Sequence, residues 1–230
     1  NGTRLISGNT IGGAIAASMR SGAAINAGVT SAANFSVVGI MNTGGTRITV
    51  SNNSIQNLQV PTRSSAGVVY GIQTSSGLNV ITGNTIIALS SNAKNVAAAT
   101  TAHLNGINHT STSVPVVGTE VNISGNTIHD LKMSADTGRV VVNGIAYTGT
   151  TTAGFNQLIQ KNLIYDLNDL TTASDTAKHV FIGIGLYGGL PTVQNNMIQV
   201  GLGNTSSQDY YGIYKANTNI NKIYHNSVYV

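Results

Sequence analysis

The chain has 230 residues, enough for one large all-β domain, and its 41% of hydrophobic residues argue against disorder although only 8% are charged. Its eleven Lys and Arg residues give a net charge of +4 but are spread along the sequence, so no clustered basic footprint for nucleic acid is expected. The chain has no cysteine, which excludes disulfides and thiolate metal sites, and no apolar run approaches the ~20 residues of a membrane span.

One phrase recurs seven times along the chain, from "RLISGNTIGGA" through "VNISGNTIHDL" to "NKIYHNSVYV". Each copy has an aliphatic residue three positions before a central Asn and another two positions after it. The alternation and the β-branched residues predict a short strand on each side of that Asn. In chain order the central residues are Asn9, Asn53, Asn84, Asn126, Asn162, Asn196 and Asn226.

A second phrase falls between successive copies of the first and predicts a third strand. It reads "SVVGIMN", "VVYGIQT", "HLNGINH", "VVNGIAY", "VFIGIGL" and "DYYGIYK". Each copy has a Gly followed by Ile, and the Gly permits a close backbone approach or a bulge. The Gly residues are Gly39, Gly71, Gly106, Gly144, Gly183 and Gly212.

A unit this small cannot bury its own apolar face, so the units must stack. Residues 1–230 are therefore expected to form one all-β segment, a right-handed parallel β-helix of about six to seven coils. We expect the central Asn to accept the left-handed or bridge conformation of the bend between two strands and to form a ladder with the Asn one coil away.

Small, Ala/Ser/Thr-rich segments separate several of the phrases and are expected on one edge of the solenoid. They cover residues 12–34, 90–102 and 168–178, and the first is long enough for a short helix around residues 14–27. The sequence also begins inside one Asn phrase and stops inside another, without a polar cap. We therefore expect a piece of a longer β-helix whose partners are neighbouring coils or domains.

The tandem of "GI" strands with "NNSI" or "GNTI" strands, ending in "IYHNSVYV", resembles the parallel β-helix repeats of very large secreted surface proteins of Bacteroidota. The resemblance extends over essentially the whole chain. Proteins of that group are exported by the type IX system and often carry adhesive modules. The resemblance thus implies a secreted or cell-surface location and a structural or adhesive role.

Many β-helices degrade polysaccharides, and such enzymes use paired carboxylates. The chain has seven acidic residues and no Asp-Asp or Asp-x-Asp pair. Asp130 and Asp166 both stand four positions after a central Asn in consecutive coils, so they are expected to stack close together and are weak catalytic candidates. The alternative is that both are solvated turn residues. Our first expectation is therefore a protein that is not an enzyme, and our second is a polysaccharide lyase or glycoside hydrolase.

Neither a metal nor another cofactor is expected. His103 and His109 are six positions apart on one strand, ~20 Å if fully extended, which is too far for one ion. No phosphate-binding loop precedes a helix.

Seven of the nine Tyr residues lie from Tyr165 onward. Three Tyr residues follow the Gly of the second phrase closely: Tyr147 by three positions, Tyr187 by four and Tyr214 by two. They are expected to form an aromatic strip on the outside of the rod. Exposed Tyr over a β-face is a common sugar-stacking surface, so these residues are the candidate glycan contacts. The alternative is ordinary packing beneath loops or against a neighbouring domain.

Overall fold

The computed structural model describes residues 4–16, 18–21, 36–45, 47–61, 67–92, 102–114, 120–134, 140–169, 179–203 and 208–230. All secondary-structure elements within these ranges are β-strands, as the sequence predicts. Most of the three small-residue segments lies outside the described residues. Where the expected helix of residues 14–27 is described, at residues 14–16 and 18–21, the structure has a strand and turns, so the helix prediction is wrong for that part.

The strands form three parallel sheets, and the strands of each sheet follow one another in coil order. The first sheet consists of β1 (Arg4–Ser7), β5 (Arg47–Ser51), β9 (Leu78–Thr82), β12 (Val121–Ser124), β15 (Gln157–Gln160), β18 (Thr192–Gln194) and β21 (Lys222–Tyr224). The second consists of β2 (Thr10–Ile11), β6 (Ser54–Gln56), β10 (Thr85–Ser91), β13 (Thr127–Met133), β16 (Leu163–Asp169), β19 (Met197–Gln199) and β22 (Ser227–Tyr229), with β3 (Met19–Arg20) and β7 (Leu58–Val60) beside it. The third consists of β4 (Ser36–Asn42), β8 (Val68–Thr74), β11 (Ala102–His109), β14 (Val141–Tyr147), β17 (Val180–Leu186) and β20 (Asp209–Lys215).

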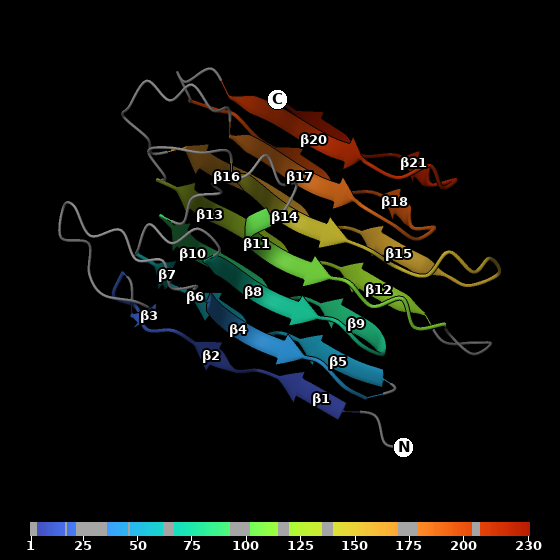
Figure 1. Cartoon of the computed structure of the whole chain (residues 1–230), viewed down its shortest axis with the longest axis horizontal. Coiled ribbons are helices and arrows are strands. Elements are labelled where there is room, and N and C mark those ends of the chain that lie inside the picture. The colour runs from blue at the N-terminus through green and yellow to red at the C-terminus, as the bar shows by residue number, and fades with distance from the viewer. Residues whose placement is uncertain are drawn as a thin grey trace.

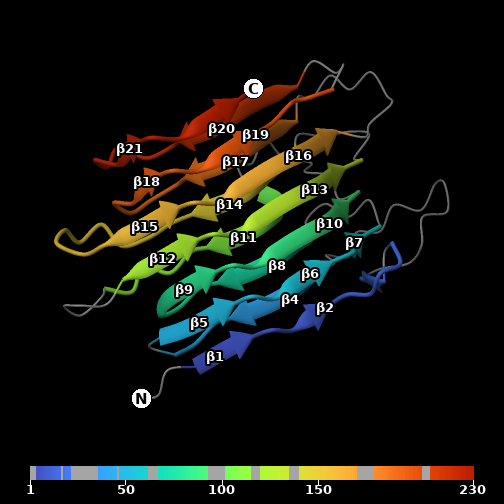
Figure 2. The ribbon, with the colours of Figure 1, turned by 180° about the vertical axis from the view of Figure 1, so that it is seen from behind.

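The chain winds through the three sheets in turn and climbs by one strand per coil. In Figure 1 the third sheet faces the viewer with its strands running to the right, and the first and second sheets return behind it. Figure 2 shows the same stack from the reverse side. The first sheet passes through seven coils, so the fold is a right-handed parallel β-helix of about seven coils, as predicted.

The two aliphatic columns that flank the central Asn residues fill the interior, as predicted. In the middle coils their side chains are fully buried. They are Val50, Ile81, Ile123, Ile159 and Val193 in the first sheet, and Ile55, Ile86, Ile128 and Ile164 in the second. Burying such a side chain contributes about 1.5–3 kcal/mol, so these columns are a main source of stability.

The Asn ladder is also confirmed. The Nδ2 group of Asn126 donates to Oδ1 of Asn162 at 2.9 Å, and the backbone N–H of Asn126 donates to the same oxygen at 3.1 Å. The Nδ2 group also donates to the carbonyl of Ile81 in the coil before, at 2.9 Å. The side-chain bond to the next coil recurs at 2.8–2.9 Å through Asn9, Asn53, Asn84, Asn126, Asn162, Asn196 and Asn226.

The left-handed residue of each corner is the residue before the ladder Asn, which corrects the assignment of that conformation to the Asn itself. Its φ lies between 54° and 69° at Gly8, Asn52, Gly83, Gly125, Lys161, Asn195 and His225. The ladder Asn residues do not have positive φ. Their role is therefore the hydrogen bonding between coils, while their neighbours make the turn.

In each strand of the third sheet, close packing requires the Gly of the Gly–Ile pair. A Cβ atom on Gly106 would lie 2.5 Å from Cγ2 of Ile128 and 2.6 Å from the carbonyl oxygen of Gly144. The Ile of the second sheet and the next coil thus occupy the space of a side chain. The close approach predicted for this column is confirmed.

A polar column interrupts the apolar interior beside the third sheet. Thr74, His109 and Tyr147 are opposite one another in successive coils, and all three are fully buried. Oγ1 of Thr74 is 2.9 Å from Nδ1 of His109, and the ring of His109 stacks on that of Tyr147 at 4.9 Å. Tyr147 donates its hydroxyl to Oε1 of Gln157 at 2.7 Å. Burial lowers the pKa of His109 to about 4.

Candidate functional site

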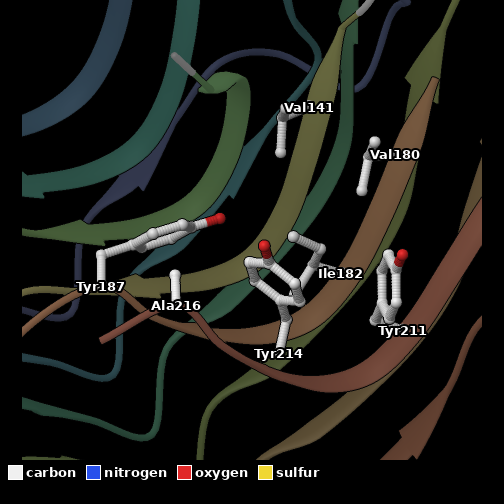
Figure 3. Close-up of a pocket in the computed structure, with 7 residues that line it drawn as sticks. All are labelled: Val141, Val180, Ile182, Tyr187, Tyr211, Tyr214 and Ala216. Atoms are coloured by element: carbon white, nitrogen blue, oxygen red, sulfur yellow. The ribbon is translucent and has the colours of Figure 1, made fainter. Parts of the chain in front are cut away.

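A pocket of about 300 Å³ lies on the outer face of the third sheet toward its C-terminal end (Figure 3). Its base is apolar, because Val141, Val180 and Ile182 point outward from neighbouring strands and pack together. Its remaining lining comes from Tyr187, Tyr211, Tyr214 and Ala216. A small apolar hollow with a few polar groups is the usual form of a ligand site.

Tyr187 is held in place by a hydrogen bond at the edge of this pocket. Its hydroxyl donates to Oδ1 of Asn143 at 2.8 Å, and Nδ2 of Asn143 donates to Oδ1 of Asn105 at 2.9 Å. Burial raises the pKa of Tyr187 to about 12, so its hydroxyl stays protonated and remains a donor. A Cβ atom on Gly185 would lie 2.7 Å from the Tyr187 ring, so the Gly makes room for that ring.

The three tyrosine rings form one cluster in which Tyr187 and Tyr211 flank Tyr214 (Figure 3). The ring centroids of Tyr211 and Tyr214 are 5.1 Å apart at an interplanar angle of 49°, and those of Tyr187 and Tyr214 are 6.4 Å apart at 56°. Tyr211 is 39% exposed. All three rings line the same pocket, and aromatic rings with apolar faces suit the stacking of a sugar ring.

Tyr147 does not belong to this cluster, and its assignment to an exposed strip is wrong. Its side chain is fully buried in the interior polar column. The physical reason is the Gly–Ile pair of the third strand, where Gly144 and Ile145 both face inward. The position two after the Gly then points outward and the position three after it points inward, so Tyr214 reaches the surface and Tyr147 does not.

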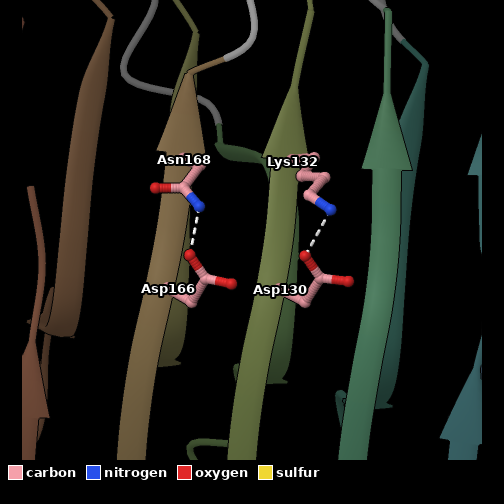
Figure 4. Close-up of polar contacts among 4 residues, drawn as sticks. All are labelled: Asp130, Lys132, Asp166 and Asn168. Carbon is pink, nitrogen blue, oxygen red and sulfur yellow. Dashed lines mark hydrogen bonds and ion pairs between the residues drawn. The ribbon is translucent and has the colours of Figure 1, made fainter. Parts of the chain in front are cut away.

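Asp130 and Asp166 stand opposite each other on β13 and β16, as the repeat predicts (Figure 4). Each carboxylate bonds to a side chain of its own strand. A carboxylate oxygen of Asp130 is 2.5 Å from Nζ of Lys132, and Asp166 accepts a hydrogen bond from Nδ2 of Asn168. Both residues have left-handed backbones, with φ of 59° and 58°. Asp is one of the few residues other than Gly that often adopts this conformation, which gives the two carboxylates a structural reason.

One further titratable group lies beside these carboxylates. The ring of His129 stacks on that of Tyr165 in the next coil, with centroids 4.5 Å apart and an interplanar angle of 8°. Partial burial lowers the pKa of His129, and the charges of Asp130 and Asp166 oppose that shift. The described residues therefore bring two carboxylates and an imidazole together on one outer face.

The described residues contain no cluster of three or more His, Asp or Glu side chains that would hold a metal ion. The part of the chain that the structure describes also has no helix with the length and hydrophobicity to span a membrane.

Two polar residues at this site are not singled out by the sequence analysis, namely Tyr211, which lines the pocket, and Asn143, which accepts the hydrogen bond of Tyr187. Tyr211 stands three positions before Tyr214, and both point outward because the Gly–Ile pair between them faces inward. Asn143 stands in the strand of the neighbouring coil, opposite Ile182. The spacing of three between Tyr211 and Tyr214 around the Gly–Ile pair is the signal that identifies the first, while no sequence pattern identifies the second.

No family model, no curated protein and no solved structure matches the chain. The fold class is therefore established by the chain's own geometry, namely three parallel sheets and an Asn ladder.

Proposed function

We propose that the chain is a non-catalytic structural and adhesive segment that binds glycans at the tyrosine pocket. The observation that carries this proposal is the cluster of Tyr187, Tyr211 and Tyr214 around an apolar hollow on the outer face of a rigid sheet. Rigid aromatic rings present apolar area at a low cost in conformational entropy, and their hydroxyls supply hydrogen bonds to a sugar.

The proposed setting is a large protein of the cell surface or of secreted material, similar to those of Bacteroidota that use the type IX system. The motifs "GNTI", "NNSI" and "IYHNSVYV" support it. In that setting further β-helical coils or neighbouring domains are the structural partners, and surface polysaccharides are the ligands. Detection of the parent protein on intact cells by an antibody to this segment tests the location.

The second candidate function is a carbohydrate-active enzyme, a polysaccharide lyase or glycoside hydrolase. The observation that favours it is the grouping of Asp130, Asp166 and His129 on one outer face. The ion pair with Lys132 and the left-handed backbones favour a structural role for the two carboxylates instead.

A glycan array followed by a reducing-sugar assay on every ligand found tests both candidates. We expect saturable binding to a subset of glycans and no release of reducing ends. Binding is expected to be unchanged in the double variant D130N/D166N, since neither carboxylate lines the tyrosine pocket. Turnover that the double variant abolishes would establish the enzyme and overturn our first candidate, and a chain that binds no glycan would also contradict it.

A further inference from the structure

The base of the tyrosine pocket is both apolar and nearly closed. Val141 lies on β14, and Val180 and Ile182 lie on β17, two strands that each have a neighbour on both sides in the third sheet. Their exposed fractions are 6%, 3% and 1%, and the ring of Tyr214 packs against them. A ligand therefore contacts this base only through a small group. Because these three side chains offer no hydrogen bond, that group must also be apolar.

The side-chain amide of Asn143, which stands beside the base, is already engaged in hydrogen bonds. Asn143 lies opposite Ile182 on the neighbouring strand, and its side chain is fully buried. Its Oδ1 accepts the hydroxyl of Tyr187 at 2.8 Å, and its Nδ2 donates to Asn105 at 2.9 Å. A sugar hydroxyl placed on the base would thus lose its hydrogen bonds to water and gain only apolar contacts, which is unfavourable.

The lining of the pocket also selects against charge. Among the described residues that line it, the only polar side-chain groups are the hydroxyls of Tyr187, Tyr211 and Tyr214, and none is charged. Tyrosine hydroxyls can bond the hydroxyls of a neutral sugar, whereas a carboxylate or an ammonium group would be desolvated without a charged partner. The volume of about 300 Å³ is at the lower end of the range for ligand pockets, which suits a single sugar residue.

We propose that the pocket binds a 6-deoxyhexose, a sugar of the fucose or rhamnose kind, with its C6 methyl group on Val141, Val180 and Ile182. This inference rests on the glycan binding proposed above and names the class of sugar. A 6-deoxyhexose has a methyl group where an ordinary hexose has a hydroxymethyl group, so no hydroxyl is buried against the base. An N-acetyl group also ends in a methyl, but its amide N–H and carbonyl need partners of their own, so it suits this base less well.

Matched sugars that differ by a single oxygen test the inference on the unaltered chain. The pairs are L-fucose with L-galactose, L-rhamnose with L-mannose, and D-quinovose with D-glucose, each as the methyl glycoside. Isothermal titration calorimetry measures the affinity of each sugar. We expect at least one 6-deoxy sugar to bind at least about tenfold more tightly than its partner, because the partner buries a hydroxyl without a hydrogen bond.

A variant of the base tests which residues cause this preference. Val180→Thr keeps the shape of the side chain but puts a hydroxyl into the base, where it can bond the C6 hydroxyl of an ordinary hexose. It is expected to remove most of the preference. Val80→Thr is the matched control, because Val80 lies on β9 of the first sheet, outside the pocket, and the preference is expected to stay unchanged. Circular dichroism and melting establish that both variants are folded.

Three results would overturn the inference. They are equal affinities within every pair, an undiminished preference in Val180→Thr, and a preference for N-acetylglucosamine over glucose without a preference for any 6-deoxy sugar. If Tyr214→Ala still weakened glycan binding in those cases, the proposed function would stand and only the class of sugar would be wrong. A chain that binds no glycan would overturn both.

Discussion

At the scale of single residues, the most unusual position is His109. Its ring is fully buried between Thr74 and Tyr147, and its Nε2 atom has no hydrogen-bond partner in the described structure. Among the described residues no carboxylate pairs with it, so burial disfavours its charged form and lowers its pKa to about 4. The residue is thus neutral in the folded chain under conditions where it becomes protonated in an unfolded one.

We expect the chain to lose stability as the pH falls from about 6.5 to about 4. Below the ordinary His pKa the unfolded state binds a proton that the folded state does not, so acid favours unfolding until the folded pKa is reached. A shift of this size corresponds to about 3 kcal/mol. Urea unfolding at pH 7, 5.5 and 4 measures it.

The control for this experiment is His109→Gln, which keeps a polar group near Thr74 and removes the titration. Carboxylates contribute their own pH dependence below about pH 4.5, and that part remains in the variant. Equal losses of stability in wild type and variant between pH 6.5 and 5 would contradict this role of His109.

At the scale of elements, the corner between the first and second sheets is the unit that holds the coils in register. The ladder Asn residues from Asn53 to Asn196 are nearly inaccessible, with exposed fractions of 1–2%. Their amides bond along the stack and to the backbone of the preceding coil. Because these groups are buried, loss of one rung leaves several polar atoms without partners.

Asn126→Ala is expected to destabilise the chain by about 2–4 kcal/mol. The variant removes the acceptor of the Asn84 amide and leaves the Ile81 carbonyl and the Asn162 Oδ1 with fewer donors. Asn9→Ala, at the exposed end of the same ladder, is the matched control and is expected to cost less than about 1 kcal/mol. Equal urea midpoints for the two variants would contradict the ladder's role.

Much of this corner between the first and second sheets could be predicted from the sequence, because the central Asn and the aliphatic columns beside it recur seven times. The inward Gly–Ile pair is the feature that simple alternation cannot supply. After this pair, each side chain of the strand points to the side opposite to the one that strict alternation predicts. Strict alternation therefore puts Tyr147 outside, although its side chain is interior. Tyr187 and Tyr214 do reach the pocket, but its apolar base of Val141, Val180 and Ile182 depends on contacts between coils.

At the scale of the whole molecule, the described chain is a stack of coils in which each coil contacts its neighbours above and below (Figures 1 and 2). Such a scaffold is rigid along its length and keeps the outer faces of its sheets in fixed register. The tyrosine pocket lies on one outer face and the Asp130 and Asp166 pair on another. Binding at the first and structural support at the second are the roles proposed here for these faces.

The measurement that tests the central claim most directly is a tyrosine fluorescence titration with the best ligand from the glycan array. The chain has nine Tyr and no Trp, so the signal comes from the tyrosines without interference. We predict saturable binding that Tyr214→Ala weakens at least about tenfold, or 1.4 kcal/mol, and that Tyr224→Ala, outside the pocket, leaves unchanged. Equal affinities for wild type and Tyr214→Ala would contradict the claim that this pocket binds glycans.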